Sequence, residues 1–378
     1  MGVFVSDSRD KIAYIASSYA TQHDGISVYL ENILYELSHL DRLVIDVYVK
    51  KSVKGKLISR VSQNNNLENI SFIALPDNFM LLIVLLNFNV NVKSYSLVFS
   101  PSLTPVLSIR NRSMKVIHDV TYKVFSKSLS FLKRTYKSLL FWLLNFDDYY
   151  GYISKPTLEQ IKTFTALHSS NKPFILLSNG IPLQTRLFFD GLTSCPSKLK
   201  KDERIKLLFV GSLNYHKGLD KALEFASLMS LKVSKPIVLR LVGKKTADTE
   251  KIMKKYSKES GFELDMKGYV TDSELYELYV ESQYILFFSH SEGFGLPVVE
   301  AGYFKTFPIL SDLPVFRELT NNKFFYYSYK RDNMNEIVDK VIDLDENNKN
   351  LTVLNSMCEK YKFKYRDSAI KICNVLDL

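Results

Sequence analysis

Two glutamates stand eight residues apart in SHSEGFGLPVVEA, residues 289–301, on either side of a Gly-Phe-Gly-Leu-Pro turn. Glu292 falls in a loop after an apolar strand, and Glu300 falls in the first turn of a helix that the proline starts. Glycines let the backbone approach a ligand closely, N–H groups at a helix start attract phosphate, and carboxylates bind sugar hydroxyls. The stretch therefore predicts a ligand with both phosphate and sugar. The alternative is a solvated Glu292, with Glu300 complementing the helix dipole.

A basic turn follows another strand in LLFVGSLNYHKGLD, residues 207–220. Gly211 ends the strand, Ser212 follows it in the turn, and Lys217 precedes a helix. A lysine at this place can neutralise a diphosphate as a point charge. The sequence lacks the Gly-x4-Gly-Lys-Ser/Thr pattern of a P-loop, and the alternative interpretation is an ordinary surface lysine.

Polar residues also follow strands in the first half of the chain. His118 and Asp119 end the strand in MKVIHDV, and Gly25 and Ile26 belong to a turn between the first strand and its helix. The histidine could face a ligand or be structural, and Gly25 could make room for a substrate or only form the turn.

The elements that must position these residues alternate along the chain. In the first half, the apolar spacing predicts helices at 27–40 and 157–164, and strands at 11–16, 43–49, 70–75, 96–100, 114–118, 147–154 and 174–180. In the second half it predicts helices at 218–230, 249–260, 272–281 and 365–376, and strands at 205–211, 236–243, 262–270, 284–289 and 307–312. This alternation predicts an α/β protein with two doubly wound domains, whose parallel sheets bind ligands beyond the carboxyl ends of their strands.

Composition limits the class of protein. The chain has 378 residues, of which 46% are hydrophobic and 24% are charged, as in soluble globular proteins. Its three cysteines form no disulfide or zinc pattern, which fits a reducing cytoplasm. The N-terminus lacks the apolar core of a signal peptide. The apolar run at 79–88 is about half the ~20 residues of a spanning helix, so we expect a buried helix there.

Positive charge is concentrated in the first half of the chain. The net charge is +10, and residues 1–178 contribute +7 of it, with 20 Lys and Arg against 13 Asp and Glu. No acid occurs at 120–146, where apolar and aromatic residues alternate with Lys123, Lys127, Lys133, Arg134 and Lys137. This segment could lie on an anionic membrane surface, bind nucleic acid or form a solvated helix face. A polar, proline-containing stretch at 193–204 is a plausible linker.

Taken together, these motifs resemble those of the family-4 retaining glycosyltransferases, which have the GT-B fold. E-G-F-G-L-P-V-V-E-A resembles the Glu-x7-Glu motif of that family, and PILSDLPVFREL continues it. The phosphate-binding turn of that family is similar to VGSLNYHKG. Its nucleotide-base segment is similar to MKGYVTDSELYELY, and its N-terminal glycine loop is similar to HDGISVYLENILYEL. The histidine motif of its N-terminal domain is similar to VIHD, and its interdomain Ser-x-x-Thr motif is similar to YISKPT. Its hinge is similar to LLSNGI. The similarity runs from about residue 11 to 376.

The resemblance implies an acceptor-binding domain at 1–180, a nucleotide-sugar-binding domain at 181–362, and a terminal helix at 363–378 that crosses back. The two domains would face a central cleft.

The resemblance also implies roles for individual residues. Glu300 would hold the ribose, Lys217 the diphosphate, and Glu292 the donor sugar and phosphate, while His118 would reach over that sugar from the facing domain. The implied donor site also includes Gly211, Ser212, Gly243, Tyr269, Val270, Gly293, Phe294, Gly295 and Leu296. Gly25, Ile26 and Asp119 would lie near the phosphates and the acceptor.

Two positions depart from the pattern of the family. Ser212 stands where arginine is frequent, so His216 or another lysine would have to supply the second positive contact. Asp24 stands where the family often has the first of two glycines. These differences leave the donor base and the sugar unassigned.

The implied reaction is retaining transfer of a hexose from a nucleotide-diphosphate sugar to a hydroxyl of a glycan or lipid-linked saccharide. The resemblance places this in assembly of an O-antigen-like or capsule-like polysaccharide, in the cytoplasm or peripherally on an anionic membrane surface at its inner face. It implies no metal, no other cofactor and no nucleic-acid partner, and DLDEN at 343–347 is taken as solvated surface. The alternatives are a sugar-nucleotide epimerase on the same fold, a hydrolase that uses Glu292 and Glu300, and a non-catalytic basic protein that binds membranes or nucleic acid.

Overall fold

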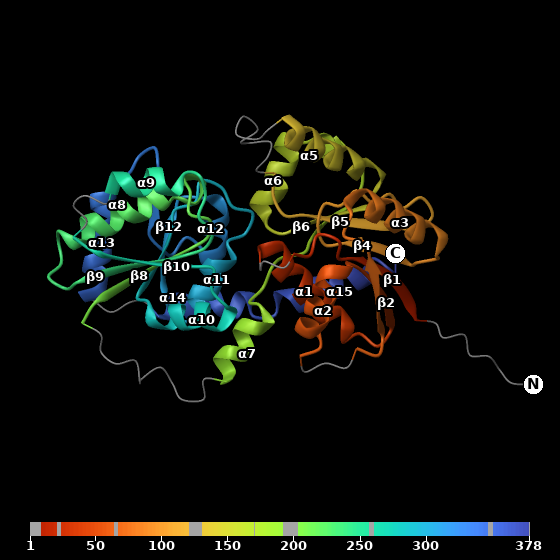
Figure 1. Ribbon diagram of the computed structural model, residues 1–378, viewed down its shortest axis with the longest axis horizontal. Helices are drawn as coiled ribbons and strands as arrows, with labels where there is room; N and C mark the ends of the chain where they lie inside the picture. The colour runs from red at the N-terminus through yellow and green to blue at the C-terminus, as the bar shows by residue number, and fades with distance from the viewer. Residues whose placement is uncertain are drawn as a thin grey trace, which may run out of the picture. The chain divides into compact units, whose positions relative to one another are not determined.

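The computed structural model describes residues 9–20, 24–63, 67–120, 131–169, 171–191, 203–256, 261–346 and 351–377. The chain forms two units (Figure 1). The N-terminal unit comprises Met1–Gly180 together with Phe363–Leu378, and the C-terminal unit comprises Ile181–Lys362. The chain therefore leaves the first unit, completes the second, and returns.

The N-terminal unit contains a parallel sheet with the strand order β3-β2-β1-β4-β5-β6-β7. The strands are β1 Asp10–Ile15, β2 Leu43–Lys50, β3 Ile70–Leu75, β4 Leu97–Ser100, β5 Ser113–Ile117, β6 Tyr149–Tyr152 and β7 Phe174–Leu176. Central strands β4 and β5 are buried along their whole length, as expected when helices cover both faces of a parallel sheet.

Helices from both ends of the chain cover this sheet. They are α1 Gly25–Ser38, α2 Lys51–Val61, α3 Phe79–Val92, α5 Phe131–Leu143, α6 Lys155–Phe164 and α15 Lys364–Asn374, with short 3-10 helices η2 Leu144–Phe146 and η3 Ala166–Ser169. Although α15 comes from the end of the sequence, it packs against α1 (Figure 1). The ring centroids of Tyr29 and Tyr365 lie 6.0 Å apart at this contact.

The C-terminal unit contains a second parallel sheet, with the strand order β10-β9-β8-β11-β12-β13. The strands are β8 Ile205–Val210, β9 Ile237–Val242, β10 Glu263–Gly268, β11 Tyr284–Phe287, β12 Phe307–Ser311 and β13 Tyr326–Tyr327. The helices are η5 Tyr215–Lys217, α7 Leu183–Gly191, α8 Leu219–Ser230, α9 Thr249–Tyr256, α10 Asp272–Glu281, α11 Leu296–Tyr303, α12 Pro314–Thr320, α13 Met334–Glu346 and α14 Leu351–Tyr361. Two doubly wound α/β units with parallel sheets confirm the predicted fold class.

Several helices have a weaker sequence signal than the strands. Helix α2, for example, buries only Val53, Leu57 and Val61, one residue per turn within a mostly polar and basic segment. Such a narrow apolar stripe does not produce the broad pattern by which α1 was predicted. Helix α1 itself starts at Gly25, two residues before the predicted start, because the side chain of Asp24 caps it by accepting from the Ser27 N–H.

Helix α3 differs from its prediction as a buried helix. Only Leu82, Leu86 and Val90 are buried, while Met80 and Phe88 are 68% and 64% exposed. The prediction was wrong because the helix packs on the sheet through one stripe only and is apolar on its outer side as well. Among the described residues, no helix combines the length and the apolar character needed to cross a bilayer.

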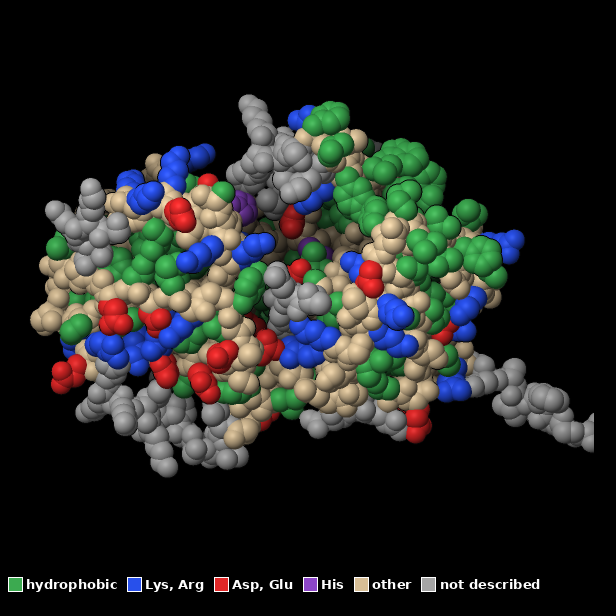
Figure 2. All heavy atoms as spheres, viewed as in Figure 1, with side chains coloured by type: hydrophobic (Ala, Val, Ile, Leu, Met, Phe, Trp, Pro, Cys, Tyr) green, Lys and Arg blue, Asp and Glu red, His purple; other side chains and the backbone are tan. Residues whose placement is uncertain are grey.

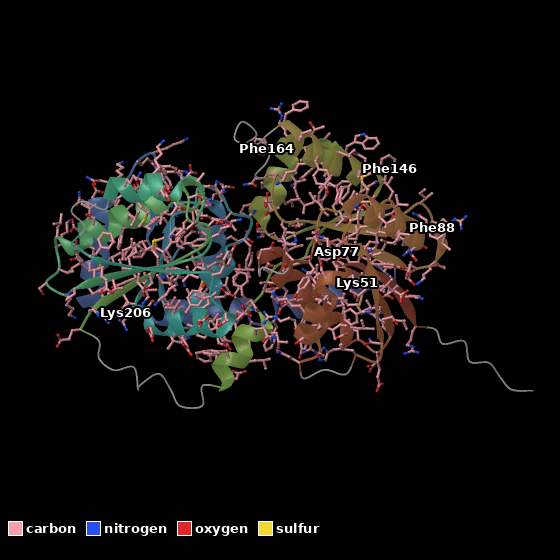
Figure 3. The ribbon with its side chains drawn as sticks, viewed as in Figure 1. Lys51, Asp77, Phe88, Phe146, Phe164 and Lys206 are labelled. Carbon is pink, nitrogen blue, oxygen red and sulfur yellow. The ribbon has the colours of Figure 1, made fainter. Side chains whose placement is uncertain are left out.

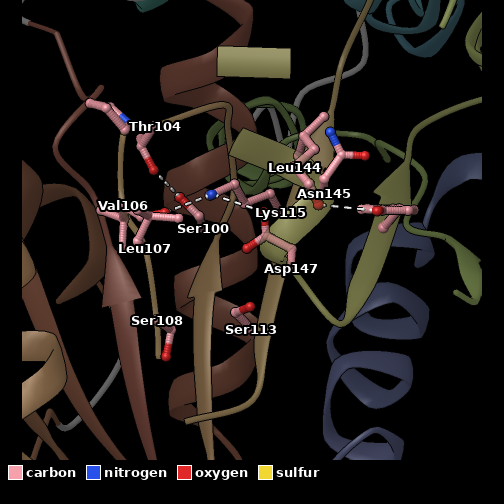
Figure 4. A network of polar contacts seen from close by, with 12 residues as sticks. Ser100, Thr104, Val106, Leu107, Ser108, Ser113, Lys115, Leu144, Asn145 and Asp147 are labelled. Carbon is pink, nitrogen blue, oxygen red and sulfur yellow. Dashed lines mark hydrogen bonds and ion pairs between the residues drawn. The ribbon is translucent and has the colours of Figure 1, made fainter. Parts of the chain in front are cut away.

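A buried ion pair fixes the middle of the N-terminal sheet (Figure 4). Lys115 lies on β5, and its ammonium group donates to Asp147 at 2.9 Å and to the carbonyl of Val106 at 2.7 Å. Both charged side chains are only 3% exposed. The pair thus joins β5 to the loop after β4 and to the residues before β6.

Two sequence predictions fall largely outside the described residues. Residues 193–202 of the predicted linker and residues 121–130 of the basic segment, which contain Lys123 and Lys127, are not described. The described part of the basic segment begins at α5.

Candidate functional site

Three glycines end neighbouring strands at the carboxyl edge of the C-terminal sheet. Gly211 follows β8, Gly243 follows β9 and Gly268 ends β10, with φ angles of 144°, 136° and 67°. A Cβ atom on Gly243 would lie 2.0 Å from the carbonyl oxygen of Gly211, so a side chain cannot fit there. The edge therefore presents backbone without side chains, as close contact with a ligand requires.

The turn after β8 is held against the end of β11. Asn214 accepts from the N–H of Lys217 at 2.9 Å and so starts η5. Gly218 then adopts a φ of 75°, and a Cβ atom there would lie 2.1 Å from the carbonyl oxygen of Phe288. The N–H of His290 donates to the carbonyl of His216 at 2.9 Å. These contacts bring the predicted phosphate turn beside the first half of the Glu-x7-Glu stretch.

Lys217 and Glu292 meet at this point. Their side chains form an ion pair with an Nζ–Oε1 distance of 2.5 Å and are 27% and 13% exposed. The hydroxyl of Ser289 donates to the same Oε1 atom at 2.7 Å. The carboxylate is thus oriented by two donors, and the ammonium group is held at the carboxyl ends of β8 and β11.

The turn between the two glutamates leads into α11. Gly295 caps the helix with a φ of 98°, and a Cβ atom there would lie 2.7 Å from the ring of Phe316. The helix begins at Leu296, one residue before the proline, so Glu300 lies in the second helical turn and not in the predicted first turn. The start of α11, the positive end of its helix dipole, follows directly on the glutamate loop, although Pro297 has no N–H and the N–H of Val298 donates to the carbonyl of Gly295 at 3.0 Å.

Glu300 is buried and has an aromatic partner. The hydroxyl of Tyr279, on α10, donates to Glu300 Oε2 at 3.1 Å. Burial, and then the negative charge of Glu300, raise the pKa of Tyr279, so its hydroxyl remains a proton donor. The ring also stacks on Phe304 with 5.7 Å between centroids. Tyr279 is therefore a positioning residue for Glu300.

The other predicted donor-site residues divide into buried and exposed positions. The ring of Phe294 is buried against Tyr361, with 5.6 Å between centroids, which leaves only its backbone for a ligand. Tyr269 follows β10 and is 59% exposed, and Val270 beside it is half-buried. Ser212 and Gly293 lie at intermediate exposure in the loops after β8 and β11.

In the N-terminal unit, His118 lies at the carboxyl end of β5. Its Nε2 atom is 2.7 Å from the carbonyl of Pro101, and its ring meets Tyr29 edge-on with centroids 4.8 Å apart. Burial lowers the pKa of His118, although the Pro101 carbonyl, Asp119 and Asp24 act in the opposite direction. In the neutral ring Nε2 must donate to the carbonyl, so Nδ1 is the acceptor.

The remaining predicted residues of this unit lie at helix starts. Gly25 and Ile26 are the first two residues of α1, so Gly25 is helical and not part of the turn. Ser154 and Thr157 of the predicted interdomain motif form the cap of α6, where the Ser154 oxygen accepts from the Thr157 N–H at 3.2 Å.

Sequence reasoning missed several residues of the site. Asn214, Ser289 and Tyr279 orient Lys217, Glu292 and Glu300, but isolated polar or aromatic residues gave no signal. Lys244 and Lys245 directly follow Gly243, and the Lys244 carbonyl accepts from the N–H of Leu213 at 2.8 Å. This Lys-Lys pair lies beside the turn that contains Ser212, where the resembled family often has arginine, and its place after a strand was visible in the sequence.

Within the described ranges, no three His, Cys, Asp or Glu residues gather in a group that could hold a metal ion. Asp343 of the DLDEN stretch lies in α13.

The architecture is that of the GT-B glycosyltransferases. Residues 194–362, nearly the whole C-terminal unit, match the family model described as Glycosyl transferases group 1, which supports a glycosyltransferase. Among solved structures, Anabaena Alr3699/HepE in complex with UDP and glucose is similar, with a TM-score of 0.70, 13% identity, and coverage of 98% of this chain and 100% of that chain. WaaG, a glycosyltransferase involved in lipopolysaccharide biosynthesis, has a TM-score of 0.67 at 13% identity, with coverage of 95% and 99%.

Among curated proteins, the chain is similar to the serotype-specific mannosyltransferase WbdA of Escherichia coli. The two are 29% identical over 154 residues, which are 40% of this chain and 18% of WbdA. A further WbdA sequence is 42% identical over 59 residues, 16% of this chain and 7% of that protein. The match thus spans less than a fifth of the length of these relatives.

Proposed function

We propose that the protein is a retaining glycosyltransferase that moves a hexose from a nucleotide-diphosphate sugar to a hydroxyl of a glycan or lipid-linked saccharide. The observation that carries the proposal is the Lys217–Glu292 ion pair, which lies between the ends of β8 and β11. It stands beside a glycine edge and a helix start, within the unit matched by the group 1 glycosyl transferases.

Each residue of the site has a role in this proposal. Lys217 and the positive end of the α11 dipole bind the diphosphate, and Glu300, oriented by Tyr279, accepts bonds from the ribose hydroxyls. Glu292 binds the donor sugar. Tyr269 and Val270, after β10, lie along the nucleotide base. From the N-terminal unit, His118 offers Nδ1 to a sugar hydroxyl, and Gly25, Ile26 and Asp119 line the acceptor side.

The reaction proceeds by departure of the diphosphate from the anomeric carbon. The carbon–oxygen bond to the phosphate breaks as the acceptor oxygen attacks the same face, and the proton of the acceptor hydroxyl passes to the leaving phosphate. The chain contributes position and charge: Lys217 and the α11 N-terminus stabilise the negative charge that grows on the phosphate. These steps require neither a metal nor a further cofactor.

The relatives suggest which donors and acceptors to try first. HepE was crystallised with UDP-glucose, and WbdA is named as a mannosyltransferase, so UDP-glucose and a mannosyl donor such as GDP-mannose come first. WaaG is a lipopolysaccharide enzyme, which makes a lipid-linked saccharide at an anionic membrane surface a reasonable acceptor.

The test is thermal stabilisation by a panel of nucleotide sugars, followed by product formation with saccharide acceptors. A donor at 100 times its Kd should add about 2.7 kcal/mol to the stability of the unit that binds it. Glu300→Gln and Lys217→Met should each abolish most of this stabilisation. The matched controls, Glu277→Gln and Lys251→Met, change exposed residues of α10 and α9 and should leave it intact.

Several results would argue against the proposal. If the same donor stabilised both Glu300→Gln and Lys217→Met as fully as the wild type, the assignment of these residues to the donor site would be wrong. Conversion of the donor without any acceptor would instead indicate the epimerase, and an inverted anomeric centre in the product would exclude retention.

A further inference from the structure

The N-terminal unit has an extended apolar surface that no described part of the chain covers. We name it the α3–α5 face. It consists of the exposed side chains of α3, α5 and η2, which are Phe79, Met80, Leu81, Val84, Phe88, Val92, Phe131, Leu132, Tyr136, Leu139, Trp142 and Phe146. Figure 2 shows hydrophobic side chains gathered over these helices, and Phe88 and Phe146 lie at the outer surface in Figure 3.

The two helices form one continuous face. The rings of Phe79 on α3 and Tyr136 on α5 meet edge-on with centroids 5.9 Å apart. Trp142 and Phe146 make a similar contact at 5.1 Å. Twelve exposed apolar side chains gathered on neighbouring helices are uncommon on a soluble monomer and mark an interaction surface.

Helix α3 is held firmly with this face outward. Asn87 accepts from the N–H of Leu107 at 2.8 Å and donates to the carbonyl of Pro105 at 3.1 Å. One turn later, Asn91 accepts from the N–H of Ile109 and donates to the carbonyl of Leu107, both at 2.8 Å. These asparagines fix α3 to the loop after β4, so the exposed side chains are not the result of loose packing.

The charges around the face are positive. Residues 79–146 contain a single acid, Asp119, and α3 itself has no charged residue. Arg134 and Lys137 are exposed on α5, and Arg110 is exposed beside Ile109, next to α3. The acids that flank the segment have partners, since Asp77 accepts from Ser52 and Asp147 pairs with Lys115.

We propose that the α3–α5 face inserts into the interface of an anionic lipid bilayer. Exposed Phe, Leu, Met and Val side chains would enter the acyl boundary, Trp142 and Tyr136 suit the headgroup level, and Arg134, Lys137 and Arg110 would contact anionic headgroups. A second copy of the chain would bring the same positive charges together, which disfavours self-association as the function of this face. The inference extends the proposed function, because a lipid-linked acceptor would be presented at this surface.

The position of Trp142 provides a direct measurement. It is the sole tryptophan of the chain and is 56% exposed. Titration of the full chain with phosphatidylglycerol–phosphatidylcholine vesicles should shift its emission to the blue, and brominated acyl chains should quench it. Flotation with the same vesicles should recover the protein at low salt. Pure phosphatidylcholine vesicles should bind at least about tenfold more weakly, because they lack the electrostatic attraction.

Substitutions separate the apolar and the charged parts of the face. Val84→Ser with Phe88→Ser should weaken binding by at least about tenfold, because two exposed apolar groups no longer enter the lipid. Arg134→Gln with Lys137→Gln should weaken binding to anionic vesicles by roughly 10- to 30-fold. The matched controls lie in the C-terminal unit: Leu231→Ser at a side chain that is 78% exposed, and Lys251→Gln with Lys255→Gln.

The proposal fails if the chain does not bind anionic vesicles at low salt, or if Val84→Ser with Phe88→Ser binds them like the wild type. It also fails if sedimentation shows a dimer that these two substitutions dissociate, or if an oligonucleotide binds and vesicles do not. Thermal stabilisation by the nucleotide sugar, measured on the same variants, distinguishes failure of this proposal from failure of the proposed function. The variants that lose vesicle binding should still be stabilised by the nucleotide sugar, and Glu300→Gln should still bind vesicles.

Discussion

At the scale of single residues, the candidate site is defined by pairs. Lys217 contacts Glu292, and Tyr279 contacts Glu300, so each charged residue proposed to bind the donor is oriented by another side chain. A phosphate that reached Lys217 would compete with Glu292 for its ammonium group. In the proposed complex, the carboxylate is then released toward the hydroxyls of the sugar while Ser289 still holds one of its oxygens.

His118 gives a prediction for pH. Burial lowers its pKa below the ordinary 6.5, so the unfolded chain binds a proton at higher pH than the folded chain does. The stability that His118 contributes is therefore present above pH 6.5 and is lost as the pH falls below that value. His118→Gln removes this contribution. The free energy of unfolding, measured with urea at pH 7.5, 6.5 and 5.5, should fall less on acidification in the variant than in the wild type. The difference should be at most about 1.4 kcal/mol per pH unit.

If the free energy of unfolding has the same pH dependence in the wild type and in His118→Gln, then the histidine has the same pKa in the folded and the unfolded chain, and the prediction is wrong. Burial also lowers the pKa of His290, but this residue is present in both proteins and cancels in the comparison.

The sequence was informative about residues that follow strands. Glu292, Lys217 and His118 were found because each lies in a segment that follows an apolar run, where a parallel sheet exposes its carboxyl edge. Tyr279 could not be found in this way. It lies in the buried stripe of α10, where an aromatic residue that orients a carboxylate has the same spacing as one that only packs.

At the scale of elements, strands were predicted more completely than helices, and burial explains this for the central strands. Strands such as β11 and β12 are buried at every residue and give unbroken apolar runs. Helix α2 is mostly polar and buries one narrow stripe, whereas α3 is mostly apolar and leaves apolar side chains exposed as well as buried. Periodicity identified neither the narrow stripe nor the exposed side.

The buried Lys115–Asp147 pair leads to a prediction for the N-terminal sheet. Lys115→Met leaves Asp147 buried without its main partner and should lower the free energy of unfolding of this unit by about 3–5 kcal/mol. Asp147→Leu should do the same through Lys115. The double variant removes both charges, so it should recover much of the loss. Urea unfolding of the four proteins measures this, and additive losses in the double variant would contradict the coupling.

At the scale of the whole molecule, the chain crosses between its units twice, near residues 180 and 362. The C-terminal unit is therefore one continuous segment, whereas the N-terminal unit is completed only when α15 returns to it. Positive charge and exposed apolar surface are both concentrated in the N-terminal unit, and the proposed donor site lies in the other. The two proposals thus assign membrane binding and donor binding mainly to different units.

Removal of residues 363–378 tests this dependence on the returning helix. Helix α15 buries Tyr365, Ile372 and Cys373, and Tyr365 donates to Asn179 at 3.3 Å. The loss should destabilise the N-terminal unit by on the order of 5 kcal/mol, because the apolar side chains of α1 become exposed. Hydrogen exchange should become faster in β1–β7 while β8–β13 stay protected, and nucleotide-sugar stabilisation of the C-terminal unit should persist. Ile370→Ser, at an exposed position of α15, is the control. Equal loss of protection in both sheets would instead mean that the chain unfolds as one cooperative body.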